Sequence, residues 1–520
     1  MPLDEVVADA PRSRARAASA EFAAARSERI APTRRVSWAG LALLGIQFVA
    51  MAAFNALQYE RFSETNDFGG YVQAWRAIAG GRLDPWVSIF QVRFLSNNLD
   101  LAMYPLALVH HLVASPVVLA WAQSAAVVAT ESVALLWARD VLEVQLAPRP
   151  RAAAVLLACT AVLLAANPWS WETIAFPVHF EAFAAFFAVL AARDLFRGRR
   201  RSLLVWVPLA LGAEALGGAY VLAVGLGGIL AGRSTRRAGC VLSAVGLGAL
   251  ALVVHFGAVG RNQATLLSTY GYLVPGMRGH VSLLRLVLGV AGHPSAVASV
   301  LASHAVYLLG YAAAGGLLGV LSPWGASAAL VVLVPNALSS QIEFIDFPAA
   351  FQSWPAEPFI VVGTVLVVAR ALRRAGTADR VAARAIRLAG GVFLLQALLL
   401  AGMVLPRIPR GWLLDERTAA ALELVAQRLP AHAEVIAEQG IIGRFAAGNA
   451  VFAIHSTGQR FPVDRARVVF ILVPGLERRD EPIARYLGGR LRAVRFVERS
   501  GVSAFLWHPG ARRTAVVLHR

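Results

Sequence analysis

Three carboxylates lie close together in a polar segment that follows the first long apolar run of the sequence. Glu60, Glu64 and Asp67 fall within eight residues. Carboxylates in such a segment can bind a cation or take a proton from a hydroxyl group. They can also belong to an ordinary solvated loop and pair with Arg61 or Arg76, and composition alone favours that simpler interpretation.

Ionisable side chains also stand at the start of a later apolar run. His179 and Glu181 occur there, after an aromatic segment in which Trp169 and Trp171 fit a membrane-interface belt. Ionisable groups at the end of a membrane span are costly unless they pair or face a cavity. A functional and a structural role are equally compatible with this pair of residues.

Glu214 is the acid most deeply surrounded by apolar sequence. A buried carboxylate needs a proton or an arginine partner, so Glu214 either belongs to a site or pairs structurally at a hairpin tip. Glu343 and Asp346 lie in a short polar segment that could face the same outer cavity, with weaker support. By placement in predicted outer loops alone, the candidate partners for a phosphate group are Arg93, Arg261 and Arg278.

The composition indicates that lipid is the main solvent of the elements that carry these residues. Hydrophobic residues make up 58% of the 520-residue chain and charged residues only 15%, against about 25% charged in average soluble domains. The net charge of +18 comes from arginine without any lysine, and the arginines cluster between apolar runs. This distribution indicates membrane topology and argues against a nucleic-acid-binding face. The two cysteines can form neither a disulfide framework nor a zinc site.

About eleven apolar runs are long enough, or nearly so, to cross a bilayer. Arginine clusters mark cytoplasmic loops, and each dense cluster falls on one side when the chain crosses at every run. We therefore expect an α-helical polytopic membrane protein, with a disordered basic cytoplasmic N-terminus at 1–36 and a transmembrane domain at 37–405. The predicted spans lie near 37–57, 114–137, 152–168, 178–195, two short stretches on either side of Glu214, 239–258, 300–318, 322–337, 355–371 and 388–405.

The last part of the chain, 406–520, has a different character. Residues 414–429 have helical periodicity, and short apolar segments at 435–437, 450–454 and 468–473 read as buried strands. Alternating strands and helices predict a small α/β domain. The segment carries no glycine-rich phosphate-binding motif, and the count of spans places it outside the cytoplasm.

Together these segments resemble the DUF2079 family of bacterial multi-spanning proteins, which is related to the GT-C membrane glycosyltransferases. The family's first-loop pattern F-D-x-G-x-x-x-Q-x-x-W is similar to Asn66–Gly69 with Gln73 and Trp75, with a one-residue offset. Its D-F-H-P-E-A pattern is similar to Pro177–Ala182, and its K-E-D pattern is similar to Ala213–Ala215. The likeness extends over most of residues 40–510.

The sequence departs from the family pattern at several acids. Proline stands at position 177, alanines flank Glu214, and Asn97-Asn98 replaces an Asp-His pair. A divergent member and a member that has lost activity are both compatible with these departures.

The resemblance implies a GT-C architecture and transfer of a sugar from a polyprenyl-phosphate carrier to an envelope acceptor, outside the bacterial inner membrane. It implies Asp67 as the base acting on the acceptor, with His179, Glu181 and Glu214 as catalytic partners that orient groups or bind metal. The need for a divalent metal ion and the oligomeric state stay open. The predicted substrate-binding residues are Glu60, Glu64, Gln73, Trp75, Arg93, Arg261, Arg278, Glu343 and Asp346.

Two other functions stay open. A transporter or flippase would line a pathway with intramembrane charges, although the sequence shows no inverted repeat of the kind common in transporters. A non-catalytic scaffold would use the α/β domain to bind a partner.

Overall fold

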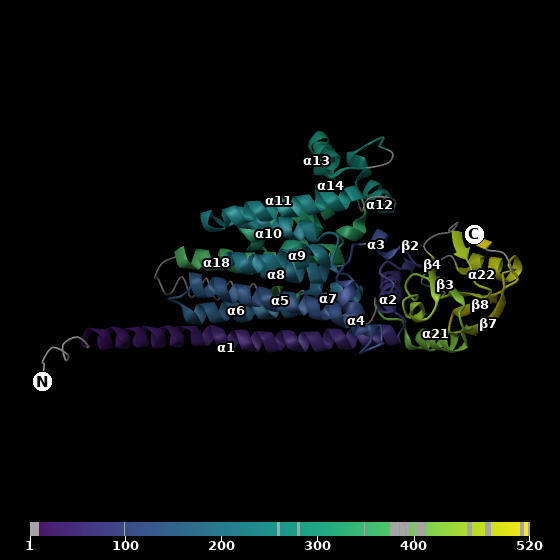
Figure 1. The fold of residues 1–520 in the computed structure, drawn as a ribbon, viewed down its shortest axis with the longest axis horizontal. Coiled ribbons are helices and arrows are strands. Elements are labelled where there is room, and N and C mark those ends of the chain that lie inside the picture. Colours follow the sequence, from purple (N-terminus) through teal and green to yellow (C-terminus); the bar gives the residue numbers. More distant parts are fainter. Residues whose placement is uncertain are drawn as a thin grey trace.

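The computed structural model describes residues 10–97, 99–256, 261–277, 281–347, 349–374, 412–454, 460–473, 480–509 and 514–517, with a few isolated positions between 384 and 402. Within these ranges, side chains are described except at 10–31, 256, 261–265, 480–481 and 514–517. The chain folds into an elongated helical bundle, and a small sheet domain covers one end of it (Figure 1).

The first helix, α1 (Ala10–Glu60), is longer than the sequence led us to expect. It contains the predicted first span within Pro32–Glu60. Residues 10–36, where we expected disorder, lie in the same helix. The physical reason is that alanine, arginine and glutamate, which dominate this segment, are strong helix formers.

Four further helices among the described residues build the bundle with α1, and each belongs to a span long and apolar enough to cross a bilayer. These are α5 (Val117–Gln145), α6 (Pro150–Ala165), α11 (Arg233–Phe256) and α18 (Glu357–Arg374). The short helices α8 (Glu181–Phe196), α9 (Leu203–Ala213) and α10 (Gly217–Ala231) pack among them, and α7 (Pro168–Ala175) continues from α6. The bundle is closed by apolar side chains that are inaccessible to solvent, among them Trp137, Trp324 and Phe359.

The α10–α11 pair shows why glycine is abundant in the bundle. A Cβ atom at Gly225 would lie 2.4 Å from the backbone nitrogen of Ser243, and one at Gly246 would lie 2.5 Å from that of Leu222. Only glycine allows the two backbones to approach so closely. Small residues at helix contacts are the usual means of association in membranes, where lipid removes the hydrophobic drive between helices.

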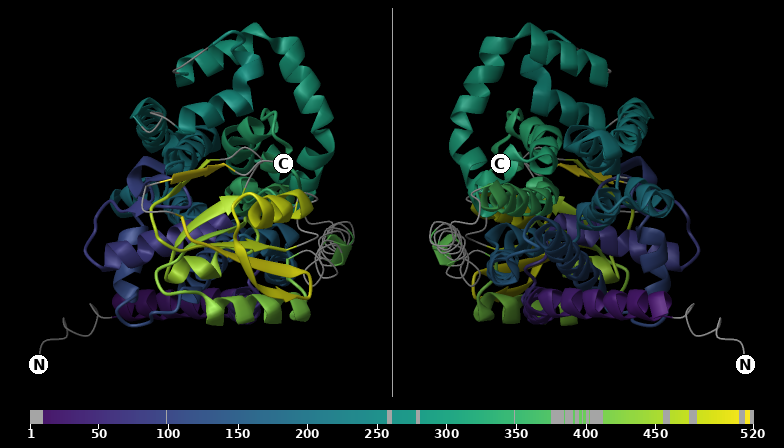
Figure 2. Two further views of the ribbon diagram at one scale, coloured as in Figure 1. Left: turned by 90° about the vertical axis from the view of Figure 1, so that its right-hand side faces the viewer. Right: turned by 90° about the vertical axis from the view of Figure 1, so that its left-hand side faces the viewer.

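Among the described residues, five helices are long and apolar enough to cross a bilayer, or six when the bent pair α13 (Leu283–Gly292) and α14 (Pro294–Ser303) counts as one span. Shorter apolar helices add α10, α15 (Ala305–Ala314) and the run Pro323–Ala337. The α13–α15 segment forms an arch at the edge of the bundle (Figure 2). A multi-pass membrane protein is confirmed, whereas eleven spans stay a prediction, and the eleventh run lies largely outside the described residues.

The run Pro323–Ala337 consists of three pieces. It begins with α16 (Pro323–Ala328), continues through one π-helical turn at Ala329–Leu333, and ends in α17 (Val334–Ala337). The remaining short helices of the membrane part are α3 (Phe94–Asn97), α4 (Met103–Val109) and α12 (Arg261–Tyr270), with 3-10 turns at Arg200–Ser202, Gly271–Leu273, Leu318–Leu321, Ile342–Phe344 and Phe351–Ala356.

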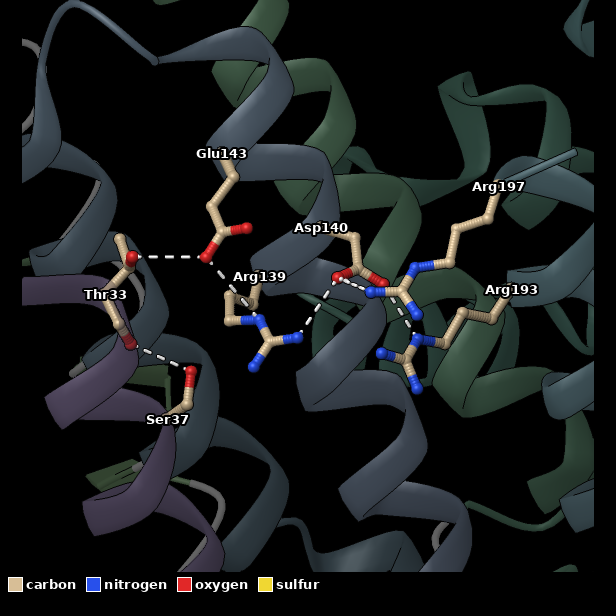
Figure 3. Close-up of polar contacts among 7 residues, drawn as sticks. All are labelled: Thr33, Ser37, Arg139, Asp140, Glu143, Arg193 and Arg197. Atoms are coloured by element: carbon tan, nitrogen blue, oxygen red, sulfur yellow. Dashed lines mark hydrogen bonds and ion pairs between the residues drawn. The ribbon is translucent and has the colours of Figure 1, made fainter. Parts of the chain in front are cut away.

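One end of the bundle is rich in arginine, and we call it the basic end. There Asp140 on α5 accepts from Arg193 Nε at 2.8 Å and from an Arg197 nitrogen at 2.7 Å, and Arg139 lies 3.4 Å away (Figure 3). Arg149 donates to the Leu372 carbonyl, and Arg200 donates to the Ser234 carbonyl. The connections between α5 and α6, α8 and α9, and α10 and α11, together with the end of α18, therefore share this end. Its cytoplasmic orientation stays a prediction.

The C-terminal domain has the expected α/β character. Its five-stranded sheet has the order β4-β3-β6-β8-β7, in which β3 (Glu434–Glu438) runs parallel to β4 (Ala450–Ile454) and β6 (Val468–Leu472). The hairpin of β7 (Val494–Arg499) and β8 (Val502–Trp507) adds antiparallel strands. The remaining elements are α21 (Glu416–Arg428), α22 (Asp480–Gly489), a 3-10 turn at Arg444–Ala447, and the pair β5 (Arg460–Val463) and β9 (Thr514–Val517).

This domain shares a hydrophobic core with the segment between α1 and α5. Helix α2 (Asn66–Ala79) lies between the bundle and the sheet (Figure 1). One buried cluster joins α2 residues such as Phe68 to Val435 and Phe445 of the domain. The Gly443 N–H donates to the Glu64 carbonyl at 3.1 Å, and the Ser88 hydroxyl donates to the Val451 carbonyl at 2.8 Å. The domain therefore holds α2 in place.

Candidate functional site

His179 lies in the turn between α7 and α8, and its ring is fixed by contacts on several sides. The Gln123 side chain accepts from its backbone N–H at 3.0 Å, and the Phe351 ring lies 3.6 Å away centroid to centroid. His179 Nδ1 lies 2.7 Å from the Phe176 carbonyl. Because a carbonyl can only accept, Nδ1 carries a proton and Nε2 is the nitrogen that can accept one.

Asp67 faces that second nitrogen from the first turn of α2. Its Oδ2 lies 3.9 Å from His179 Nε2, and its side chain is 44% exposed. This separation is too long for a direct hydrogen bond and suits a bridging hydroxyl or water. Helix α2 reaches this place because Gly69 and Gly70 follow Asp67: a Cβ at Gly70 would lie 2.3 Å from the Phe90 ring.

A second group of acids continues from Asp67 into the bundle. The Tyr71 hydroxyl donates to Asp100 Oδ2 at 2.8 Å, and both side chains are buried. Burial raises the pKa of Tyr71, and the negative charges of Asp100, Glu181 and Asp67 raise it further. These three carboxylates therefore lie within electrostatic reach of one hydroxyl.

Glu214 joins the same group from the break between α9 and α10. It is 8% exposed, and its Oε2 accepts from the Leu216 N–H at 2.6 Å. Burial raises the pKa of Glu214 well above its usual value, and the nearby charges of Glu181 and Asp100 add to that rise. The outer loop is tied to this break because the Leu101 N–H donates to the Gly212 carbonyl.

The structure thus brings together the four residues proposed as catalytic from the sequence. They come from segments that lie far apart in the chain, namely the start of α2, the α7–α8 turn with the first residue of α8, and the α9–α10 break. We call Asp67, Asp100, Glu181 and Glu214, with Tyr71 and His179, the acidic cluster. In the described part of the chain, neither Asp67, Glu181 nor Glu214 forms an ion pair with arginine.

Sequence reasoning missed Asp100 and Tyr71. Asp100 stands between two leucines just after the Asn97-Asn98 pair on which we aligned the family's Asp-His. An acid between leucines at the end of an outer loop was the available signal, because such a side chain is expected to be buried and partnered. Tyr71 gave no signal apart from its position one helical turn after Asp67.

Several predicted substrate-binding residues make hydrogen bonds or ion pairs with other parts of the protein. The Gln73 amide donates to the Ser88 hydroxyl and the Asn449 carbonyl, which joins α2 to the sheet domain. The Trp75 indole is fully buried and donates to the Leu106 carbonyl. Arg93 is exposed beside Asp84, at 4.0 Å. Their assignment as substrate ligands stays a prediction.

The other predicted residues of the outer side lie in varied places. Glu60 is exposed, and its carbonyl accepts from Arg444. Glu64 is fully buried, neither of its carboxylate oxygens has a hydrogen-bond partner among the described residues, and burial raises its pKa well above the usual value. Glu343 is exposed and Asp346 is half-buried. The Arg261 side chain and all of Arg278 lie outside the described residues.

An apolar cavity of about 300 Å³ lies next to the acidic cluster. Leu216 and Tyr220 line it, and the charges of Glu214 and Glu181 also act electrostatically on Tyr220. The remaining walls come from α10–α13 and from the run Pro323–Ala337. Among the described residues, no group of three or more His, Cys, Asp or Glu side chains is arranged to hold a metal ion.

Comparisons with known proteins place this chain. A solved structure of ArnT from Cupriavidus metallidurans bound to undecaprenyl phosphate is similar at 12% identity and a TM-score of 0.46, over 89% of this chain and 97% of that one. No curated protein matches the chain. The pattern of the family described as "Predicted membrane protein (DUF2079)" matches residues 58–471. That match covers well over half of the sequence, so this chain belongs to the DUF2079 family of membrane proteins.

Proposed function

We propose that this protein is a membrane glycosyltransferase that moves a sugar from a polyprenyl-phosphate carrier to an envelope acceptor on the extracytoplasmic side. The observation that carries the proposal is the convergence of Asp67, His179, Glu181 and Glu214, from separate segments, at the end of the bundle opposite the basic end. Chemistry at a membrane surface requires such a polar group beside an apolar compartment, and the cavity at Tyr220 supplies one.

The reaction needs a base near the acceptor hydroxyl. The Asp67 carboxylate takes the hydroxyl proton as the acceptor oxygen bonds to the anomeric carbon of the donor. The bond from that carbon to the phosphate oxygen breaks, and the polyprenyl phosphate leaves with the electron pair. His179 Nε2, across 3.9 Å from Asp67 Oδ2, holds the acceptor hydroxyl in line.

An anionic donor must enter a site that is rich in carboxylates. Glu214 relieves that repulsion, because its raised pKa keeps it protonated and neutral at pH values where an ordinary glutamate is ionised. A protonated carboxyl can also donate a hydrogen bond to the leaving phosphate. Two acids of one site with different surroundings thus take different roles.

The apolar cavity fits the carrier's chain. Its walls are mostly leucine and valine, and the polar side chains among them are Tyr220, Tyr270, Asn336 and Gln352. Burying the first prenyl units there would place the attached phosphate beside Glu214, because Leu216 belongs to both the cavity and the α9–α10 break.

Purified protein in proteoliposomes tests the proposal. A panel of radiolabelled polyprenyl-phosphate hexoses and pentoses is offered with an envelope-glycan acceptor, and transfer is compared for the wild type, Asp67→Asn and Glu143→Gln. Glu143→Gln is the matched control, since it makes the same carboxylate-to-amide change at the basic end. We expect transfer by the wild type and the control, and its loss in Asp67→Asn with the fold intact.

Two results would contradict the enzyme. Undiminished transfer by Asp67→Asn would remove the proposed base. Movement of the intact carrier across the bilayer without any sugar transfer would favour the transporter or flippase instead.

A further inference from the structure

Two glutamates lie entirely inside the helical bundle and take no part in the proposed reaction. Glu131 on α5 and Glu357 at the start of α18 are both 0% exposed. Each belongs to a helix that is long and apolar enough to cross a bilayer. The two carboxyl groups interact electrostatically, so they form one buried acid pair.

The surroundings of this acid pair are polar but incomplete. The Asn167 amide donates to Glu357 Oε1 at 2.9 Å, whereas Glu357 Oε2 has no hydrogen-bond partner in the described part of the chain. Gln47 from α1 and Ser170 from α7 approach Glu131, but neither of its carboxylate oxygens is hydrogen-bonded. The Gln47 amide is 4% exposed, and both of its polar atoms also lack a bonded partner. Unpartnered polar atoms on three helices therefore point into one buried place.

The same helix shows what a compensated carboxylate looks like. Asp140 lies nine residues after Glu131 on α5, about 13 Å along the helix axis, and arginines 139, 193 and 197 surround it. Within the described residues, Gln47 and Ser170 act on Glu131. Asn167 and the charge of Glu131 act on Glu357. No arginine or histidine is among them.

Two ionised carboxylates in an apolar interior repel each other, and each loses its hydration. Such a pair persists only when a positive charge accompanies it. A proton is the occupant that needs the fewest ligands, since the carboxyl that holds it can donate to the other carboxylate or to the Gln47 oxygen.

We propose that Glu131 and Glu357 form an intramembrane site that binds an exchangeable proton. The proton is shared between the two carboxyls when bound and returns to water when released, so no other reactant is needed. The inference stands on the bundle alone and does not depend on sugar transfer.

Helix α7 links this site to the acidic cluster. Asn167, which caps α7, and Ser170 in its first turn contact the acid pair. At the other end, Gln58 donates to the Ala175 carbonyl, and His179 follows. Helix α7 therefore contacts the acid pair at one end and leads into the turn that carries His179 at the other.

Infrared spectroscopy of the full chain tests this inference directly. A protonated carboxyl has its own C=O stretching band, which shifts on exchange into heavy water. We expect part of this band at neutral pH to disappear in Glu131→Gln or Glu357→Gln. Glu143→Gln, a matched change on α5 at a carboxylate paired with Arg139, should leave the band unchanged.

A second pair of variants removes any doubt from misfolding. In protein made with isotope-labelled glutamate, Glu131→Asp and Glu357→Asp keep an acid at each position but take it out of the labelled signal. Loss of labelled intensity supports the proton site. The inference is overturned when all four variants match the wild type, and also when sodium at constant ionic strength removes the band, since a metal cation would then be the occupant.

Discussion

Buried acids at the two ends of the bundle have neighbours of opposite charge. At the basic end, Asp140 is 6% exposed and sits among arginines 139, 193 and 197 (Figure 3). At the other end, Glu214 is buried to a similar degree, and its electrostatic neighbours are the acids Glu181 and Asp100. A compensated carboxylate serves the fold, because removing it leaves unpaired cations. A carboxylate among other acids costs stability and persists for another reason, which we take to be chemistry.

The comparison predicts that substitutions at the outer end reduce activity and that those at the basic end reduce stability. The largest effect is expected for Asp67→Asn. Losing a general base typically lowers the rate by about 10²–10⁴-fold, while the exposed position of Asp67 on α2 leaves the fold intact. The transfer assay measures the first quantity, and thermal unfolding in detergent measures the second. If Asp67→Asn lost as much stability as an Asp140 variant, the contrast between the two ends of the bundle would be wrong.

Asp140→Ala should behave in the reverse manner. Removing one partner from a buried charge network costs about 3–5 kcal/mol, and here three guanidinium groups would lose their carboxylate. Denaturant unfolding in micelles gives this cost. The activity per folded molecule should stay at the wild-type level, and a selective loss of activity would assign the basic end a catalytic role.

Tyr71→Phe examines Asp100, the carboxylate of the acidic cluster that accepts from a tyrosine hydroxyl. The Tyr71 hydroxyl donates to Asp100 at 2.8 Å in a buried place. A hydrogen bond to a charged group contributes about 1.5–3 kcal/mol, so the variant should unfold at a lower denaturant concentration. An unchanged midpoint would mean that Asp100 is satisfied without Tyr71.

Glu64→Gln should raise stability, and the gain should depend on pH. The raised pKa of Glu64 means that the folded chain keeps a proton which the unfolded chain releases above about pH 4.3. The stability of the wild-type protein therefore falls as the pH rises from about 4.3 through the raised pKa that Glu64 has in the folded chain. The amide cannot ionise and removes that loss, so the gain should grow as the pH rises. Melting curves from pH 5 to 9 that run parallel for both proteins would contradict this.

The smallest effect is expected for Glu143→Gln at the basic end. Glu143 is 29% exposed and lies 3.6 Å from Arg139. Pairs in such partly exposed positions contribute about 0.2–1 kcal/mol. A larger loss in the same unfolding experiment would show that Glu143 belongs to the Asp140 network.

The first turn of α2 and the α9–α10 break show how much of the candidate site can be predicted from the sequence. Asp67, His179, Glu181 and Glu214 could each be chosen from their polar character in apolar surroundings. That reasoning passed over Asp100, and the family resemblance added Gln73 and Trp75, whose contacts hold α2 against its neighbours. Local pattern identifies an unusual residue, but it does not tell a ligand from a packing contact.

The sequence by itself determined a membrane protein with arginine clusters at one end and an α/β domain at its C-terminus, because apolar run length, charge spacing and strand–helix alternation are local properties. Only the tertiary structure decided which acids meet. Proximity of Asp67 to His179, and of Glu131 to Glu357, depends on helix packing between segments more than a hundred residues apart. Whether a buried carboxylate is compensated depends on which side chains that packing places beside it, and no local pattern records this.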